Sequence, residues 1–321
     1  MIRWGIIGCG GIANKMADAL YRTEDAELVA VAARTLPRAE DFAAKHNVAR
    51  AYGSYAELAA DPDVDAVYVA TIHPTHAMAV ELCLNAGKAV LCEKPFGMTK
   101  AEGDAMFALA KEKNLLLMEA IWTRFLPAWR KAKELVESGA IGDVKTVYTD
   151  FSIKAGFDPE SRLFNMEKGG GCTLDLGVYS LHCALYILGN DVKSVQAVGR
   201  LSPTGSDNYA VTTMQFESGA VAVAASGMDC CGGTCEARIM GEHGSIVMPG
   251  MMGSDVCILR RDGHPEEVLR FPYENGFTFE VEEFQSLLKA GKCVSEIATP
   301  EATLTVAGIM DTTMDQIRKS N

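Results

Sequence analysis

The sequence predicts an α/β protein of two domains, with a doubly wound parallel sheet over residues 1–120 and a large open, mostly antiparallel sheet over residues 121–321. Three observations predict this. A chain of 321 residues exceeds what one ordinary hydrophobic core accommodates. Short apolar strands alternate with helical patterns up to residue 120, which is the rhythm of repeated βαβ units. After Trp122, strand patterns follow one another with only short turn signals between them.

The elements of the first part are read from short apolar runs that alternate with segments of helical periodicity. The predicted strands are Arg3–Ile7, Glu27–Ala32, Ala66–Val69, Ala89–Cys92 and Leu115–Glu119. The predicted helices are Ile12–Tyr21, Arg38–His46, Thr75–Asn85 and Lys100–Glu112. Gly87 stands just past the end of one of these helices, where a glycine is a common stop signal.

The second part begins with a predicted helix at Pro127–Ser138 and is then dominated by strands. The predicted strands are Lys145–Ile153, Ser194–Leu201, Ala210–Glu217, Ala220–Ser226, Glu236–Met240, Val256–Arg260 and Glu267–Phe271. An apolar helix over residues 171–188 interrupts the sheet, and helices at Thr278–Leu288 and Thr299–Ile317 close the chain.

The composition excludes several classes of protein. Hydrophobic residues make up 48% of the chain, which favours a packed interior over disorder. The net charge of −12 and the lack of a Lys or Arg block argue against nucleic acid or an anionic membrane as partner. No apolar run is expected to span a bilayer, and a strand that begins at Ile2 leaves no room for a targeting segment.

Cysteine usage indicates a reduced, cytoplasmic protein, because ten cysteines lie mostly inside predicted strands and helices of a large chain. The one cluster is Asp229–Cys235, "DCCGGTC". It lacks a CxxC pair and a nearby pair of histidines, so we predict no metal site. A hairpin turn at Gly232 and Gly233 is the favoured interpretation of that stretch.

A glycine-rich turn follows the first strand directly and opens a helix. Gly8 would permit the tight turn, Gly10 would let the backbone approach a pyrophosphate, and Ala13 would let helix and strand pack closely. The alternative is a purely structural turn, but the strand–turn–helix context favours a dinucleotide site. The residues predicted to bind the cofactor here are Gly8, Cys9, Gly10, Gly11, Ile12 and Ala13.

The end of the second strand predicts which dinucleotide binds. An NAD site usually has Asp or Glu there for the ribose hydroxyls, whereas this strand ends with Arg34, followed by Thr35 and, one turn on, Arg38. An arginine can bind a 2′-phosphate through charge-assisted hydrogen bonds. We therefore favour NADP over NAD, the alternative being that both arginines are ordinary surface residues.

Two further strand ends are expected at the same crevice, because ligands of open α/β sheets bind at the carboxyl ends of strands. "VLCEKPFG" brings Glu93 and Lys94 to one of them, and a cis Lys94–Pro95 bond would be one way to aim the lysine. A surface lysine is the alternative. The neighbouring strand end adds four candidates for cofactor contact, Thr71, Ile72, His73 and His76.

The helix over 171–188 carries a polar stripe beside its apolar one. Asp175, Tyr179, His182 and Tyr186 follow one another at i, i+4, i+7 and i+11, so they share a face. Burying a carboxylate, a phenol and an imidazole is unfavourable unless they find partners. The stripe therefore indicates either a site or a buried hydrogen-bonded network.

Three motifs in this order, "GCGGIA", "EKPFG" and "GGGCTLDLGVY", resemble the Gfo/Idh/MocA oxidoreductases, which combine a Rossmann domain with an α/β domain that has an open sheet. "LNAGKAVLCEKP" and "LLLMEAIWTRFLPA" are similar to the branch of dimeric dihydrodiol dehydrogenases and NADP-dependent D-xylose dehydrogenases. The resemblance covers nearly the whole chain. It implies that Lys94, Asp175 and Tyr179 are catalytic and that NADP exchanges freely. His182 departs from the Asp of inositol-type relatives, which disfavours an inositol substrate.

The resemblance implies hydride transfer between a sugar or cyclic diol hydroxyl and nicotinamide C4. A free phenol has a pKa of about 10, and the cation of Lys94 would lower it so that Tyr179 can act as acid or base. Asp175 would orient the substrate or Lys94; Lys94 as the direct acid–base group is the alternative. Candidate substrate contacts, each of which could instead be core or surface packing, are Trp122, Arg124, Phe151, Phe157, His182 and Phe277.

The partners implied are a small polyol, sugar or diol and a second copy of the chain. The family's dimers use the open sheet, and the strand in Gly219–Met228, "GAVAVAASGM", places small alanines on one face, where another sheet could approach closely. The alternative is that a helix of the same chain covers that face. Two rival functions remain, an oxidoreductase for another polyol and a non-catalytic dinucleotide sensor. The presence of both Lys94 and Tyr179 disfavours the sensor.

Overall fold

The computed structural model describes residues 1–230 and 235–321, so the predicted hairpin turn at Gly232 and Gly233 lies outside the described residues. The chain forms two compact units. The N-terminal unit comprises Met1–Trp122 and Asn275–Thr303, and the C-terminal unit comprises Thr123–Glu274 and Leu304–Asn321. The sequence analysis assigned everything after residue 120 to the second domain, whereas the structure assigns Asn275–Thr303 to the first unit.

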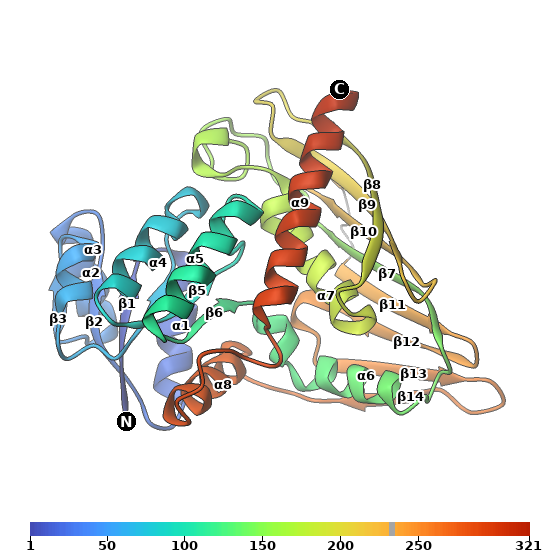
Figure 1. Cartoon of the computed structure of the whole chain (residues 1–321), viewed down its shortest axis with the longest axis horizontal. Coiled ribbons are helices and arrows are strands. Elements are labelled where there is room, and N and C mark those ends of the chain that lie inside the picture. The colour runs from blue at the N-terminus through green and yellow to red at the C-terminus, as the bar shows by residue number, and fades with distance from the viewer. Residues whose placement is uncertain (231–234) are drawn as a thin grey trace. The chain divides into compact units, whose positions relative to one another are not determined.

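The N-terminal unit contains a parallel six-stranded sheet in the order β3-β2-β1-β4-β5-β6 (Figure 1). Its strands are β1 (Ile2–Ile7), β2 (Ala26–Ala32), β3 (Arg50–Tyr52), β4 (Ala66–Val69), β5 (Ala89–Glu93) and β6 (Leu117–Ala120). The predicted doubly wound sheet is confirmed. The sequence analysis missed β3, because three residues give no usable periodicity.

Helices cover both faces of this sheet. They are α1 (Gly11–Arg22), α2 (Leu36–His46), α3 (Tyr55–Ala60), α4 (His76–Asn85), α5 (Lys100–Lys113) and, from the C-terminal part of the sequence, α8 (Phe277–Lys289). Trp4 of β1 packs against Phe284 of α8 with ring centroids 5.1 Å apart. Asn275 donates hydrogen bonds to Asp18 and to the Lys15 carbonyl of α1. These contacts explain why α8 belongs to the N-terminal unit.

The C-terminal unit contains an eight-stranded sheet in the order β14-β13-β12-β11-β7-β10-β9-β8. Its strands are β7 (Val144–Ser152), β8 (Val192–Leu201), β9 (Asp207–Phe216), β10 (Val221–Gly227), β11 (Cys235–Gly241), β12 (Gly244–Pro249), β13 (Val256–Arg261) and β14 (Glu267–Arg270). Every neighbouring pair is antiparallel except β7 with β10. The predicted open, mostly antiparallel sheet is therefore confirmed, with β12 as the strand that was missed.

Three helices lie along one face of the large sheet, α6 (Pro127–Glu137), α7 (Val178–Leu188) and the later part of α9 (Pro300–Ser320) (Figure 1). Ala222 and Ala224 are buried on this face. Ala224 lies beside Thr149, whose hydroxyl donates to the Ser180 carbonyl of α7 at 3.0 Å. The expectation that these alanines meet a second sheet is therefore wrong, because their small size instead lets α7 lie close to β10.

The segment Met166–Leu188 is long and apolar enough to cross a membrane by length and composition, which the sequence analysis did not expect. In the structure 89% of its most apolar window is buried inside the protein. Packing against the large sheet accounts for this apolar character, since a mostly buried core helix can be as apolar as a membrane span.

Candidate active site

The predicted phosphate turn has the geometry that its glycines require. Gly8 has a φ of +98°, and a Cβ there would lie 2.5 Å from the Ala70 carbonyl oxygen, so no larger residue fits. Gly10 precedes the first turn of α1, and a Cβ on it would meet no atom within 4 Å. The space beside Gly10 is therefore open, as the approach of a pyrophosphate to the backbone requires.

Two exposed arginines stand beside this turn. Arg34 follows β2 and Arg38 lies in the first turn of α2, with Thr35 between them as the residue that precedes the helix. In residues 1–230 and 235–321 neither guanidinium pairs with a carboxylate. Arg38 is close enough to oppose the burial that raises the pKa of Cys9 to about 11. Uncompensated positive charge beside the phosphate turn fits a 2′-phosphate.

The loop after β4 is tied to the loop after β5 by His76. This side chain is completely buried, and its Nδ1 and Nε2 lie 2.9 Å from the Pro95 carbonyl and 3.1 Å from the Thr71 carbonyl. Burial lowers the pKa of the imidazole, so it is neutral near pH 7. His73 is also buried and packs edge-on against His76, whereas Thr71 and Ile72 are half-buried. Direct contact of these four residues with a cofactor stays a prediction.

Lys94 lies half-buried at the carboxyl end of β5, and the Lys94–Pro95 peptide bond is cis. Glu93 is 5% exposed and accepts hydrogen bonds from the Tyr68 hydroxyl and from the Lys94 backbone N–H, the latter at 3.1 Å. Burial raises the pKa of Glu93 to about 7, against the opposing effect of the Lys94 charge. The backbone of Lys94 is thus fixed by a carboxyl group that titrates near neutrality.

The polar stripe begins in a π-helical turn, Thr173–Gly177, which continues into α7. Such turns are rare and occur frequently at functional sites. Asp175 is 7% exposed, and its two oxygens accept from the guanidinium of Arg162 at 2.9 and 3.3 Å. Sequence reasoning missed Arg162, because an arginine in an irregular loop gives no periodic signal that would link it to Asp175.

Tyr179 and Phe151 lie against each other in the structure. Tyr179 is 5% exposed, and the ring of Phe151 meets it edge-on with centroids 5.8 Å apart. Phe157, another candidate substrate contact, is 51% exposed and packs edge-on against Phe164. The phenol of Tyr179 therefore lies against one aromatic ring of β7 in the same unit.

The remaining substrate candidates fall into two buried pairs. Trp122 and Phe277 stack within the N-terminal unit, with centroids 5.0 Å apart and an interplanar angle of 18°. Arg124 of the C-terminal unit donates to the His182 carbonyl at 3.2 Å and lies 5.5 Å from the Tyr186 ring centroid. His182 is 1% exposed. Their contact with a substrate stays a prediction, and cation–π packing is what the structure shows for Arg124.

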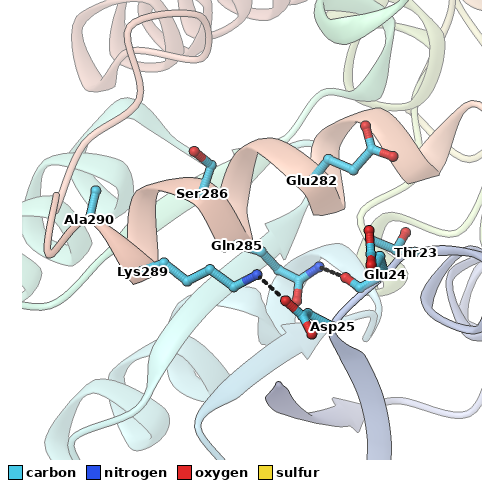
Figure 2. A pocket seen from close by; sticks show the side chains of 8 residues that line it. All are labelled: Thr23, Glu24, Asp25, Glu282, Gln285, Ser286, Lys289 and Ala290. Carbon is cyan, nitrogen blue, oxygen red and sulfur yellow. Dashed lines mark hydrogen bonds and ion pairs between the residues drawn. The ribbon is translucent and has the colours of Figure 1, made fainter.

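A surface pocket of about 600 Å³ lies at the opposite edge of the parallel sheet (Figure 2). The pocket lies between the turn before β2 and one side of α8. The ion pair between Lys289 and Asp25, at 2.9 Å, is part of its lining. The residues that line it are Thr23, Glu24, Asp25, Glu282, Gln285, Ser286, Lys289 and Ala290. Because the carboxyl ends of the strands lie at the other edge, this pocket is not the dinucleotide site.

Comparison with known proteins decides the family. The model of an oxidoreductase family with an NAD-binding Rossmann fold matches residues 2–121, and the model of the Gfo/Idh/MocA C-terminal domain matches residues 129–247. The chain belongs to the Gfo/Idh/MocA oxidoreductase family. The resemblance seen in three sequence motifs is thereby confirmed, and the phosphate turn lies at the start of the dinucleotide-binding half. Among residues 1–230 and 235–321, no cluster of three or more His, Cys, Asp or Glu side chains suits a metal ion.

Relatives of this Gfo/Idh/MocA protein are similar over almost the whole chain. Trans-1,2-dihydrobenzene-1,2-diol dehydrogenases from Xenopus tropicalis and Danio rerio are 36% and 37% identical, with at least 97% of each chain covered. The 3-ketoreductase KijD10 from Actinomadura kijaniata, in complex with NADP and TDP-benzene, has a TM-score of 0.89 at 28% identity over 98% of both chains. The aldose–aldose oxidoreductase from Caulobacter crescentus has a TM-score of 0.91 at 25% identity, over 100% of this chain and 98% of that one.

Proposed function

We propose that this protein is an NADP-dependent dehydrogenase that acts on a hydroxyl group of a sugar or a cyclic diol. The observation that carries the cofactor assignment is the pair Arg34 and Arg38, which have no carboxylate partner in the described residues, beside an open helix N-terminus. The relative KijD10 was crystallised with NADP. The relatives named dihydrodiol dehydrogenases and the aldose–aldose oxidoreductase support a diol or aldose substrate.

In the proposed reaction NADP, when bound, supplies nicotinamide C4 as the acceptor or donor of hydride. The protein handles the proton. Tyr179 takes the proton of the substrate hydroxyl during oxidation and returns it during reduction. A phenol with an ordinary pKa of about 10 is a poor base at neutral pH. In the proposed mechanism the positive charge of Lys94 lowers the pKa of Tyr179 by favouring its phenolate form, and the Lys94 ammonium group also hydrogen-bonds the reacting oxygen of the substrate. Direct proton transfer by Lys94 is the alternative.

Asp175 has a narrower role than the sequence suggested. Its carboxylate is already held by Arg162 through two hydrogen bonds. The pair presents a fixed hydrogen-bonding surface rather than a mobile base, because a bidentate contact restrains both side chains. We assign Asp175 to orienting the substrate, with Arg162 holding its carboxylate in place.

The test is steady-state turnover with NADP and NAD on D-xylose, D-glucose and trans-dihydrodiols. Tyr179→Phe is expected to lower kcat by about 10²–10⁴-fold while NADP affinity stays within about twofold. Tyr273→Phe is the matched control, since it removes a half-buried phenol of the same unit whose hydroxyl donates to the Gly253 carbonyl. A normal kcat in Tyr179→Phe would remove this residue from the chemistry. Tight NADP binding without turnover on the whole panel would favour the sensor.

We further propose a homodimer that uses the face of the large sheet opposite α7. Tyr148, Val223 and Arg238 stand side by side on that face, as the strand register requires. Apolar side chains are exposed along it, with Val198 at 67% and Tyr148 at 45%. An exposed apolar surface spread over several strands favours a protein partner.

We also propose that the protein works in the cytoplasm. The described cysteines are all free thiols, which supports a reducing compartment.

A further inference from the structure

The helix that carries the polar stripe begins at a carboxylate from a distant strand. Asp207 is the first residue of β9 and is 5% exposed. Its Oδ2 accepts a hydrogen bond from the Thr173 backbone N–H at 2.6 Å and one from the Cys172 thiol at 3.2 Å. These partners lie 34 and 35 residues earlier in the chain. Thr173 opens the π-helical turn that contains Asp175.

This contact fills a need that the helix cannot meet from its own sequence. The first N–H groups of a helix have no partner inside it, and the residue that precedes the π-helical turn offers no capping side chain. An anion is also favoured at this end by the helix dipole. Asp207 supplies both the acceptor and the negative charge. A charge-assisted hydrogen bond of 2.6 Å is at the strong end of the range for N–H donors.

One of the glycines that precede the turn, Gly171, is explained by the same carboxylate. Gly171 has a φ of +138°, and a Cβ there would lie 2.1 Å from the Oδ1 of Asp207. A Cβ on Gly170 would lie 2.9 Å from the backbone of Asn165. Only glycine at position 171 therefore lets the carboxylate reach the helix start.

Further along, α7 is held to the sheet by a different set of contacts. The Ser180 hydroxyl donates to the Ala225 carbonyl at 2.9 Å, and Thr149 donates to the Ser180 carbonyl at 3.0 Å. Tyr179 lies between these contacts and the one at Thr173. Contacts at both places restrain the helix against sliding and rotation. The position of the phenol then depends on the position of the helix start.

We propose that Asp207 is a positioning residue of the active site, which acts through the Thr173 N–H to set where Asp175 and Tyr179 stand. The proposal rests on the proposed function, in which these two side chains take part in turnover. A displacement of about 1 Å in an acid–base group can cost about 10²-fold in rate. Loss of the carboxylate should therefore lower kcat far more than it lowers NADP affinity.

The experiment compares Asp207→Ala, Asp207→Asn and a control in the full-length protein. The control is Thr212→Val, which lies on the same strand and removes a buried hydrogen bond of 3.0 Å to Thr313 of α9 instead of one to the start of α7. Turnover, NADP affinity and the hydrogen exchange rate of the Thr173 amide are measured for each. Asp207→Ala should lower kcat by about 30–100-fold, with NADP affinity within about twofold and fast exchange at Thr173.

Asp207→Asn keeps a hydrogen-bond acceptor but loses the negative charge. Its kcat should therefore lie between those of the wild type and the Ala variant, about 3–10-fold below the wild-type value. Thr212→Val should turn over normally. A normal kcat in the Ala variant, or an equal loss in Thr212→Val, would overturn the proposal. If the Ala variant does not fold, the Asn variant decides, and a normal kcat there overturns it. Tyr179→Phe is measured alongside: normal turnover there refutes the proposed function and this proposal with it.

Discussion

A buried carboxyl group should make the stability of this protein depend on pH in a defined direction. Glu280 of α8 is completely buried, and in the described part of the chain neither of its oxygens has a hydrogen-bond partner. Burial, followed by the negative charges of Glu93 and Glu119, raises the pKa of this carboxyl well above its ordinary range. We therefore expect Glu280 to be neutral in the folded protein near pH 7, since an isolated buried charge is very unfavourable.

The direction and size of the change in unfolding free energy with pH follow from proton linkage at Glu280. In the unfolded chain Glu280 ionises near its ordinary pKa of about 4.3, whereas the folded protein retains the proton to a higher pH. Its contribution to stability is therefore full below the unfolded pKa and is lost as pH rises toward the folded one. Over that window the contribution of Glu280 to the free energy of unfolding falls by about 1.4 kcal/mol per pH unit, or roughly 2 kcal/mol between pH 5.5 and 7.0.

The measurement is urea unfolding of the wild type and Glu280→Gln at several pH values between 5.5 and 7.0. Glutamine has nearly the same shape and no proton to lose, so its stability relative to the wild type should grow by roughly 2 kcal/mol over this range. Glu282→Gln is the control, because that glutamate is exposed on the same helix. A stability difference for Glu280→Gln that stays constant with pH would refute the reasoning, since the carboxyl would then ionise normally in the fold.

Three further changes test the cofactor site, the Asp175 partner and the dimer. Arg34→Asp should reduce kcat/KM for NADP by about 10–100-fold and raise it for NAD, as loss of a charged contact implies; an unchanged cofactor ratio would contradict the 2′-phosphate assignment. Arg162→Met leaves the Asp175 carboxylate without its observed bidentate partner and should lower the free energy of unfolding by roughly 1–3 kcal/mol, a figure already discounted because Arg162 is half-exposed. Thermal unfolding measures this loss, with Arg162→Lys as the control. Val223→Glu should convert the dimer to a monomer in sedimentation analysis, whereas a monomeric wild type would end that proposal.

The fold was predictable wherever a segment is long and periodic. The parallel strands, the polar helix and the antiparallel sheet all follow from runs of several apolar residues. Two strands were missed: β3 has three residues, and β12 begins at Gly244, just after the glycine that ends β11, where glycines obscure the pattern. The assignment of α8 to the first unit could not be predicted either. Phe284 of α8 packs on Trp4, which lies 280 residues earlier, and periodicity says nothing about which sheet a helix covers.

The site was predictable in its motifs and not in its supporting contacts. Gly8, Lys94 and Tyr179 belong to local patterns, so each could be found from a few neighbouring letters. Arg162 and Asp207 could not be found in this way, because each lies in a separate segment and contacts the π-helical turn before α7 only in the folded chain. The same reason explains the error on the alanine face of β10. Small residues predict a close approach, but the approaching group, here α7, is set by tertiary structure.

Glycine serves opposite purposes in the two glycine-rich motifs, and the structure separates them. At Gly10 an added Cβ would meet nothing, so the space in front of α1 is available to a ligand. At Gly171 the same Cβ would strike the carboxylate of Asp207, so the space is already filled by the protein. One helix N-terminus is thus left open to bind a phosphate, and the other is closed by an internal anion. A helix that must hold acid–base side chains at a fixed position benefits from the second arrangement, since its anchor does not leave with the product.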